Sequence, residues 1–398
     1  MSDNALSSLN SLNSLNSLSF TTMNNPQQTQ RIYGLDTLRT CAILLVLMSH
    51  YGVVVSHKST FGFLTDIGWM GVDLFFVLSG YLIGNQVLSS YARGARFSLK
   101  TFFARRLLRT LPNYYVVLAL YFIFPSLLAG TDTASLWRFL TFTQNIGLHF
   151  GETFSHSWSL CVEEQFYVVL PLISFMIAGL SKPAVWSRIT IALLIIIPIA
   201  VRGFSWLKLG ENLMTSEDYA AHIYYSSFAR FDELSAGVLI ALLKNFKIDL
   251  YDSIMRKGNS LLASGMLMFA LTVYLLLNYS EIEGYGFTFT CMTFGYSLLA
   301  ASFALLTMAA LSPTSLLNRM RVPGAESLAL WSYAIYLAHK PLFKLMIIPM
   351  SLWQIDTNAP LGIVIVMMAA LCGGWFLYHI VETPFMTLRA KFFPNTSL

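Results

Sequence analysis

A histidine and an arginine share one apolar stretch of this sequence, and their spacing suggests chemistry. His50 and Arg39 belong to residues 36–55, DTLRTCAILLVLMSHYGVVV, a run long enough to cross a bilayer. They are eleven positions apart, so at about 100° per residue they share a helix face and lie about 16 Å apart along the axis. Ionisable groups inside a membrane are costly and usually mark a functional site. A neutral imidazole can take a proton from a hydroxyl, so we expect His50 to act as a general base.

Carboxylates occur at similar depth in two other apolar runs. Asp73 lies in GVDLFFVLSGYLIG, and Glu163 and Glu164 lie in HSWSLCVEEQFYVVLPL. We predict that all three are catalytic and that Asp73 or Glu163 orients His50. The two glutamates are adjacent and about 100° apart on a helix, so at most one of them should point at His50. The alternative for each group is a structural role, with the carboxylate satisfying the histidine or a backbone donor.

A fourth apolar run brings a further charged group to this depth. The segment FARFDELSAG contains Arg230, Asp232 and Glu233. We predict that these three residues, together with Trp158 of the HSWSL segment, bind the acceptor substrate. The alternative is an ion pair that locks neighbouring helices together.

Three further arginines, Arg105, Arg106 and Arg109, precede the third apolar run. Arg105 and Arg109 are four residues apart, so they share a helix face. Guanidinium groups bind phosphate oxygens through paired hydrogen bonds. We therefore predict that these arginines and Arg39 bind a phosphorylated cofactor. The alternative is an anchor to anionic lipid headgroups.

The sequence lacks the motifs of several other kinds of catalysis. It contains no GxSxG, HExxH, Walker or GxGxxG motif, so covalent serine catalysis, metal-dependent hydrolysis and nucleotide hydrolysis are unsupported. Cys41, Cys161, Cys291 and Cys372 lie in different apolar runs without zinc-site spacing. We expect no metal.

Composition and hydropathy predict the elements that position these residues. The chain has 398 residues, of which 56% are hydrophobic and 11% charged, whereas an average soluble domain has about 25% charged residues. We predict an all-α, polytopic membrane protein with about ten transmembrane helices. Gly80 and Gly84 indicate close helix packing. The predicted spans are residues 36–55, 66–90, 111–130, 157–180, 187–207, 226–244, 259–278, 287–310, 327–350 and 360–381.

The distribution of charge among the loops predicts the orientation. The connection between the second and third spans is rich in arginine and contains no acid from residue 75 to 131, which is typical of a cytoplasmic loop. Loops on the opposite side carry mainly acids, so both termini should be cytoplasmic. The net charge of +5 then reflects membrane topology and gives no support for nucleic-acid binding.

The chain divides into three predicted parts. Residues 1–30 repeat Ser-Leu-Asn and are rich in Asn and Gln, which is typical of a disordered low-complexity tail. Residues 31–389 form the predicted membrane domain. Residues 390–398 are a short predicted cytoplasmic tail.

The same motifs resemble those of a known family. GLDTLRTCAILLVLMSH, GVDLFFVLSGYLIG, RRLLRTLPNYY, HSWSLCVEEQFYVVLPL, FARFDELSAGVLIA, SYAIYLAHKPLF and VETPF occur in the order found in the acyltransferase 3 family of bacterial integral membrane proteins. The resemblance covers roughly residues 31–389. It implies that His50 is the essential histidine, that Arg39 is its motif partner, and that Arg105, Arg106 and Arg109 engage a CoA donor.

The resemblance also implies a reaction. Members of the family transfer acyl groups, often acetyl from acetyl-CoA, to hydroxyls of carbohydrates, and some modify macrolides. We expect a multi-pass protein of the bacterial cytoplasmic (inner) membrane, with acyl-CoA, membrane lipids and a carbohydrate or glycolipid acceptor as partners. The alternatives are acylation of a small lipid or macrolide, and proton-coupled transport without catalysis.

Overall fold

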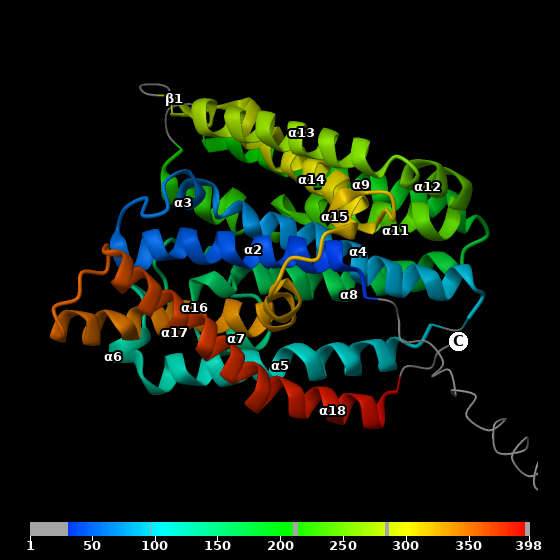
Figure 1. Ribbon diagram of the computed structural model, residues 1–398. Coiled ribbons are helices and arrows are strands. Elements are labelled where there is room, and N and C mark those ends of the chain that lie inside the picture. Colours follow the sequence, from blue (N-terminus) through cyan, green and yellow to red (C-terminus); the bar gives the residue numbers. More distant parts are fainter. Residues whose placement is uncertain (1–30, 96, 210–213, 283–285, 395–398) are drawn as a thin grey trace, which may run out of the picture. The chain divides into compact units, whose positions relative to one another are not determined.

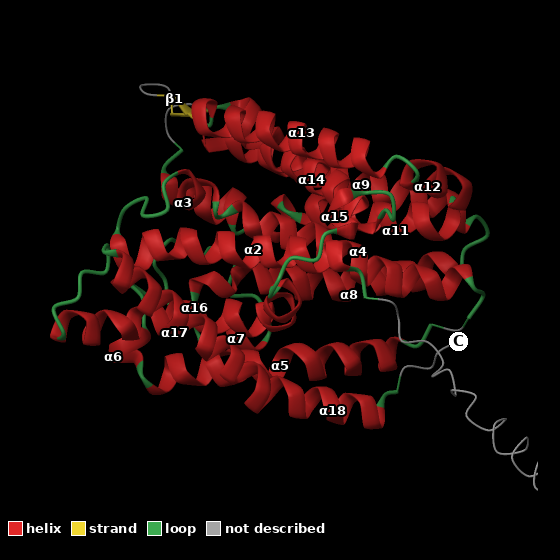
Figure 2. Ribbon diagram, in the orientation of Figure 1, coloured by secondary structure: helices red, strands yellow, loops and turns green. Residues whose placement is uncertain are grey.

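The computed structural model describes residues 31–95, 97–209, 214–282 and 286–394, and these form a helical bundle (Figure 1). Helices account for nearly all of the regular structure (Figure 2), so the predicted all-α class is confirmed. The predicted low-complexity tail, residues 1–30, and the final residues 395–398 lie outside the described residues.

The long helices run side by side in the bundle (Figure 1). They are α2 (Tyr33–Tyr51), α4 (Met70–Ala92), α5 (Leu99–Ile123), α8 (Trp158–Ala178), α9 (Pro183–Leu209), α11 (Phe231–Phe246), α13 (Gly258–Tyr279), α14 (Phe289–Leu311), α16 (Ala325–Leu352) and α17 (Pro360–Leu377).

Short elements connect or extend these helices. The short helices are η1 (Gly52–Ser56), α3 (Phe63–Ile67), α6 (Pro125–Leu128), α7 (Leu136–Leu140), η2 (Ser155–Ser157), α10 (Ser216–Tyr219), η3 (Ala220–Tyr224), η4 (Ser227–Ala229), α12 (Ile248–Met255), α15 (Leu316–Arg319), η5 (Tyr378–Glu382) and α18 (Thr383–Phe392). Strands β1 (Glu281–Ile282) and β2 (Gly286–Phe287) form an antiparallel pair.

Several helices present apolar side chains outward. Among the described residues, seven helical segments are long and apolar enough to cross a membrane. Only 6% of the apolar window of α9 is buried, so these side chains would face water in a soluble protein. Their exposure is explained by contact with lipid, and the chain is a multi-pass membrane protein. The other three predicted spans coincide with α5, α11 and α16, of which α11 has only 16 residues.

Helix α5 begins earlier than the hydropathy predicted. The predicted span starts at residue 111, whereas α5 starts at Leu99, and the Ser98 side chain caps it by accepting a hydrogen bond from the Thr101 amide (3.2 Å). The arginines that were placed in a loop therefore lie on this helix. Pro112 is accommodated within α5.

The backbones of α4 and α11 approach each other very closely. A Cβ atom added to Gly80 would overlap the Leu234 carbonyl oxygen, and one added to Gly237 would overlap that of Val77. Glycine is required at both positions because any larger residue would push the helices apart. The predicted packing role of Gly80 is thereby confirmed, and Gly84 faces Val238 on the same side. Helix α2 packs against both α4 and α16.

Candidate active site

His50 lies at the end of α2, against a cavity of about 700 Å³ that we call the outer cavity. The π-helical turn η1 begins directly after Tyr51, and such turns are frequent at functional sites. Helices α2, α4, α5, α8 and α16 and the connections before α8 and α11 contribute to the wall. Its polar and aromatic lining residues include His50, His57, Trp69, Tyr121, Glu152, His156, Trp158, Tyr219, Tyr224, Tyr225, Lys340 and Lys344.

Two further histidines surround His50. Nδ1 of His50 lies 2.8 Å from Nε2 of His339, and their rings are stacked with centroids 4.9 Å apart. The ring of His156 lies 6.3 Å from that of His50 and 5.1 Å from that of His339. The three imidazoles therefore form one cluster, from α2, α16 and the 3₁₀ turn η2.

Backbone carbonyls of α16 accept hydrogen bonds from two of these rings. Nδ1 of His339 lies 3.2 Å from the Ile335 carbonyl oxygen, and Nε2 of His156 lies 3.2 Å from the Leu337 carbonyl oxygen. Leu337 would normally accept a helical bond from the residue four positions later. That residue is Pro341, which has no N–H. The proline therefore leaves the carbonyl free to fix the orientation of His156.

The prediction that Asp73 or Glu163 orients His50 is corrected by the structure, because both carboxylates have other partners. The Asp73 carboxylate accepts a hydrogen bond from Arg230 (2.6 Å), and that of Glu163 accepts one from Ser79 (2.7 Å). Asp73 follows Val72, which lines the outer cavity, and one helical step turns it about 100° away toward α11. Glu163 lies about 7.5 Å further along α8 than Trp158, because each residue advances the helix by about 1.5 Å. His50 is paired instead with a histidine.

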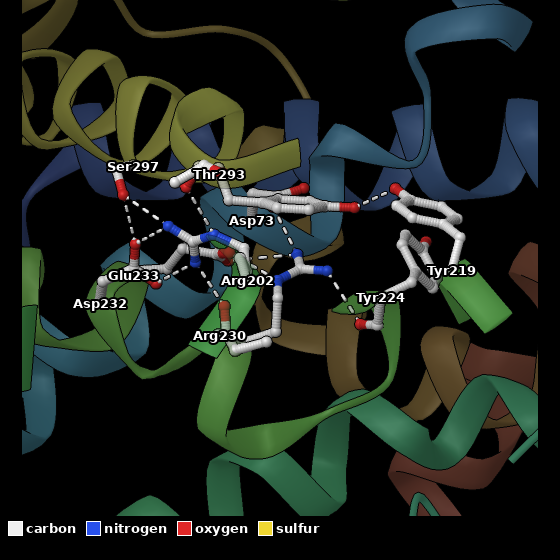
Figure 3. Close-up of polar contacts among 11 residues, drawn as sticks. Asp73, Arg202, Tyr219, Tyr224, Arg230, Asp232, Glu233, Thr293 and Ser297 are labelled. Carbon is white, nitrogen blue, oxygen red and sulfur yellow. Dashed lines mark hydrogen bonds and ion pairs between the residues drawn. The ribbon is translucent and has the colours of Figure 1, made fainter. Parts of the chain in front are cut away.

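A buried ion-pair network joins α4, α9, α11 and α14 (Figure 3). Arg230 contacts Asp73 (2.6 Å) and Glu233 (2.6 Å), and all three side chains are 0% exposed. Arg202 of α9 contacts Asp232 (2.8 Å), which also accepts a hydrogen bond from Ser297 (2.6 Å). The network is arranged so that every arginine has a carboxylate partner.

Aromatic rings cover this network on one side. The guanidinium of Arg230 lies 3.8 Å from the centroid of the Tyr296 ring, and the hydroxyls of Tyr296 and Tyr219 are hydrogen-bonded. Arg230, Asp232 and Glu233 do not line the outer cavity. The structure therefore has the ion-pair arrangement that was the alternative to acceptor binding, whereas Trp158 does line the cavity.

A second cavity of about 410 Å³, which we call the inner cavity, brings the predicted arginines together. Arg39 from α2 and Arg105, Arg106 and Arg109 from α5 all line it, and α18 adds Arg389. Helices separated by many residues thus bring five guanidinium groups to one site. This concentration of positive charge suits an anion with several charges.

Of these five arginines, only Arg106 makes an ion pair within the described residues, whereas Asp36 acts on Arg39 and Glu382 acts on Arg109 and Arg389 from further away. Arg106 lies 3.6 Å from Glu164 and 4.0 Å from Glu163, and its guanidinium stacks 3.9 Å from the centroid of the Tyr167 ring. Glu163 and Glu164 thus belong to the arginine end of the bundle and not to the histidine end. Within the described part of the chain, no carboxylate lies within 4.0 Å of the other four guanidinium groups.

The two cavities lie along the same helices. Arg39 and His50, on one face of α2 as predicted, line the inner and the outer cavity respectively. Val72 of α4 lines both, so this side chain stands where they meet. Val72, packed beside α2, is therefore part of the wall between the cavity of the arginine cluster and that of the histidine cluster.

Several residues of these cavities were not predicted from the sequence. His339 and Lys340 lie in the motif SYAIYLAHKPLF inside a predicted span, so the reasoning applied to His50 also applied to them. His156 directly precedes a predicted span and Arg389 follows the last one, and a charged or polar residue is ordinary at both places. Lys340 Nζ donates to Ser155 Oγ (3.3 Å).

The phenols of the outer cavity are neutral donors. Burial raises the pKa of the Tyr224 and Tyr225 hydroxyls above the ordinary tyrosine range. Both rings line the cavity beside Trp158, with centroids 4.9 and 5.3 Å from the Trp158 ring. Neutral hydroxyls on aromatic rings suit a polar, uncharged surface such as a sugar. Within the described residues, no group of three His, Cys, Asp or Glu side chains is arranged to hold a metal ion.

Comparison with known proteins gives a consistent result. The sequence model of an acyltransferase domain family matches residues 32–379. The chain is 26% identical over 380 residues to the putative peptidoglycan O-acetyltransferase YrhL of Bacillus subtilis, covering 91% of this chain and 56% of the relative. It is 26% identical to the O-acetyltransferase OatA of Staphylococcus aureus, covering 88% and 56%. It is 27% identical to the peptidoglycan O-acetyltransferase OatA of Listeria monocytogenes, covering 78% and 49%.

The chain spans about half the length of the curated relatives that it matches. No solved structure matches it.

Proposed function

The chain belongs to the acyltransferase 3 family, and from this premise we propose that it is a membrane O-acetyltransferase. The donor is acyl-CoA, held in the inner cavity, and the acceptor is a hydroxyl of a cell-wall or other exported carbohydrate in the outer cavity. The observation that carries the proposal is the pair of cavities on one helix, with a cluster of five arginines at one and a histidine cluster at the other.

The inner cavity supports a phosphorylated donor. CoA carries several phosphate charges, and guanidinium groups bind phosphate oxygens more strongly than neutral donors do. Arg39, Arg105, Arg109 and Arg389 line the cavity without a carboxylate within 4.0 Å among the described residues. Their charges are therefore available to an anionic ligand. The acyl thioester would extend from there past Val72 toward His50.

The outer cavity supports general-base catalysis. The imidazole of His50 takes the proton of the acceptor hydroxyl, while the hydroxyl oxygen attacks the thioester carbonyl carbon. The new C–O ester bond forms and the C–S bond breaks. The CoA thiolate leaves and receives the proton from His50, so the imidazole ends the cycle neutral. The predicted catalytic roles of Asp73, Glu163 and Glu164 become indirect, because these residues hold Arg230 and Arg106 in place.

The relatives' names support a carbohydrate acceptor. Two of them are described as peptidoglycan O-acetyltransferases, and the rings of Trp158, Tyr224 and Tyr225 line the outer cavity. Aromatic rings with neutral hydroxyls suit the apolar faces and hydroxyls of a sugar. A small lipid or macrolide acceptor would instead be revealed by activity that is independent of the glycan.

The predicted membrane orientation completes the proposal. Ten spans with both termini in the cytoplasm would place the inner cavity on the cytoplasmic side of a bacterial inner membrane and the outer cavity on the opposite side. The arginines of α5 would then satisfy the bias of Lys and Arg toward the cytoplasm. A cytoplasmic acyl-CoA pool would thus serve an acceptor outside.

The direct test is acetyl transfer by purified protein. Labelled acetyl-CoA and peptidoglycan fragments are mixed with the wild type and with the His50→Gln variant, and the label in the glycan is measured. We expect transfer by the wild type and a loss of about 10² to 10⁴-fold in the variant, the range for general-base catalysis. The matched control is His379→Gln, an exposed histidine outside both cavities. Full activity of His50→Gln would overturn the mechanism. If the protein in vesicles moves the glycan across the membrane without acetylating it, the protein is a transporter.

A further inference from the structure

We propose that His339 is a positioning residue that fixes the tautomer of His50 and so makes Nε2 of His50 the atom that accepts the proton. The inference deepens the proposed function and rests on it, since it concerns the same reaction. The hydrogen bonds around the two rings carry it.

The Ile335 carbonyl determines the tautomer of His339. A carbonyl oxygen only accepts hydrogen bonds, so Nδ1 of His339, 3.2 Å away, carries the hydrogen. A neutral imidazole has one N–H, so Nε2 of His339 is then a bare acceptor.

The tautomer of His339 in turn determines that of His50. Its bare Nε2 lies 2.8 Å from Nδ1 of His50, so this Nδ1 is the donor. Nε2 of His50 is therefore without a hydrogen, and among the described residues it has no hydrogen-bond partner. A chain of two hydrogen bonds thus runs from a backbone carbonyl through His339 and ends at a basic nitrogen.

The positions of the two rings separate their roles. His50 lines the outer cavity, whereas His339 is not among its lining residues and is 0% exposed. His339 is enclosed by the rings of Tyr336 and Phe343, at 5.8 and 5.7 Å. A substrate in the cavity can therefore reach His50 but not His339, which acts only through His50.

His156 does not form part of this chain. Its Nε2 donates to the Leu337 carbonyl (3.2 Å), and its Nδ1 has no partner among the described residues. The relay therefore ends at His50 and has no continuation that would carry the proton away. The proton taken by His50 stays on that ring until the CoA thiolate accepts it, while His339 keeps its hydrogen bond to Nδ1.

The test compares three substitutions of His339 in full-length protein. His339→Leu removes the acceptor, and we expect kcat to fall by about 10 to 100-fold, less than the loss of the base itself, with KM for acetyl-CoA and for the glycan unchanged. His339→Gln places an amide oxygen near the former Nε2 and should restore most of kcat. His339→Asn places its oxygen near Nδ1 and should not. Equal activity of the Gln and Asn variants would refute the proposal.

A spectroscopic measurement separates positioning from a purely structural role. Imidazole nitrogen NMR of isotope-labelled protein, with His50 assigned from the His50→Gln spectrum, should show the hydrogen on Nδ1 in the wild type and a mixture of tautomers in His339→Leu. An unchanged His50 tautomer in His339→Leu would overturn the inference. If the wild type transfers acetyl and His339→Leu is fully active, only this inference fails, whereas an inactive wild type with every acceptor contradicts the proposed function itself.

Discussion

Removal of Arg230 should destabilise the protein strongly. The guanidinium donates to Asp73 (2.6 Å), to both oxygens of Glu233 (2.6 and 3.3 Å) and to the Tyr224 carbonyl (3.0 Å), and the three charged side chains are 0% exposed. In Arg230→Met the carboxylates of Asp73 and Glu233 lose this partner without gaining water. Breaking one such buried pair costs about 3–5 kcal/mol, which is a large share of a total stability of about 5–15 kcal/mol. We therefore expect the free energy of unfolding to fall by about 3–5 kcal/mol.

The assay is chemical unfolding of purified protein in detergent, followed by tryptophan fluorescence. The matched control is Glu217→Gln, which removes an exposed partner of His149 (3.4 Å) and should change the free energy of unfolding by less than about 0.5 kcal/mol. Adding Asp73→Asn to Arg230→Met should recover part of the loss, because one of the unpaired charges is then absent. The reasoning is refuted if Arg230→Met unfolds like the wild type. If Arg230→Met unfolds like the wild type but binds the glycan more weakly, then Arg230 contacts the acceptor, which is the role predicted from the sequence.

Three further predictions concern the cavities and the helix packing. Arg109→Met should raise KM for acetyl-CoA by about 10- to 150-fold without changing kcat, since a charged hydrogen bond to phosphate contributes about 1.5–3 kcal/mol. The exposed Arg93→Gln is its control, and an equal effect of both would indicate general electrostatics only. Val72→Trp should close the passage between the cavities and lower kcat by more than about tenfold with acetyl-CoA binding retained; normal turnover would mean that the acyl group takes another route. Gly80→Ala should lower the free energy of unfolding by about 1–3 kcal/mol. The control Gly179→Ala, in open surroundings, should have little effect. Equal effects of the two substitutions would contradict the close approach of α4 and α11.

The position of His50 was predictable because the cost of an ionisable group in a membrane is a local property of the sequence. The helical period also predicted correctly that Arg39 and His50 share a face, and each lines a cavity on α2. The helical period gives only the direction in which a side chain points around the axis of its own helix. It does not say which helix lies in that direction, so His339, 289 residues away from His50, was not predicted as its partner.

The misplaced carboxylates have the same origin. Depth along each span suggested that Asp73 and Glu163 lie near His50, but depth ignores the direction around the helix. Val72 faces both cavities, and Asp73, the next residue, faces Arg230. Arg202 was missed because its partner Asp232 lies on another helix. Pairing between helices depends on tertiary packing, which the sequence of one span does not contain.

The early start of α5 shows a limit of hydropathy. Its first turns carry Arg105 and Arg106, whose charge lowers the hydropathy although both residues line a cavity within the bundle. A charged loop and a charged helical segment that lines a cavity have similar compositions, so hydropathy does not distinguish them. The role of these arginines as a cluster was nevertheless predictable from their spacing.

The measurement that tests the account most directly is acetyl transfer across a sealed membrane. The protein is reconstituted into proteoliposomes with one orientation, selected by the accessibility of its C-terminus. Labelled acetyl-CoA is supplied on the arginine side and glycan only on the histidine side. We predict labelled ester on the glycan, no acetyl-CoA in the glycan compartment, and loss of the product in His50→Gln. Formation of product only when donor and acceptor share one compartment would contradict the passage of the acyl group from the inner to the outer cavity.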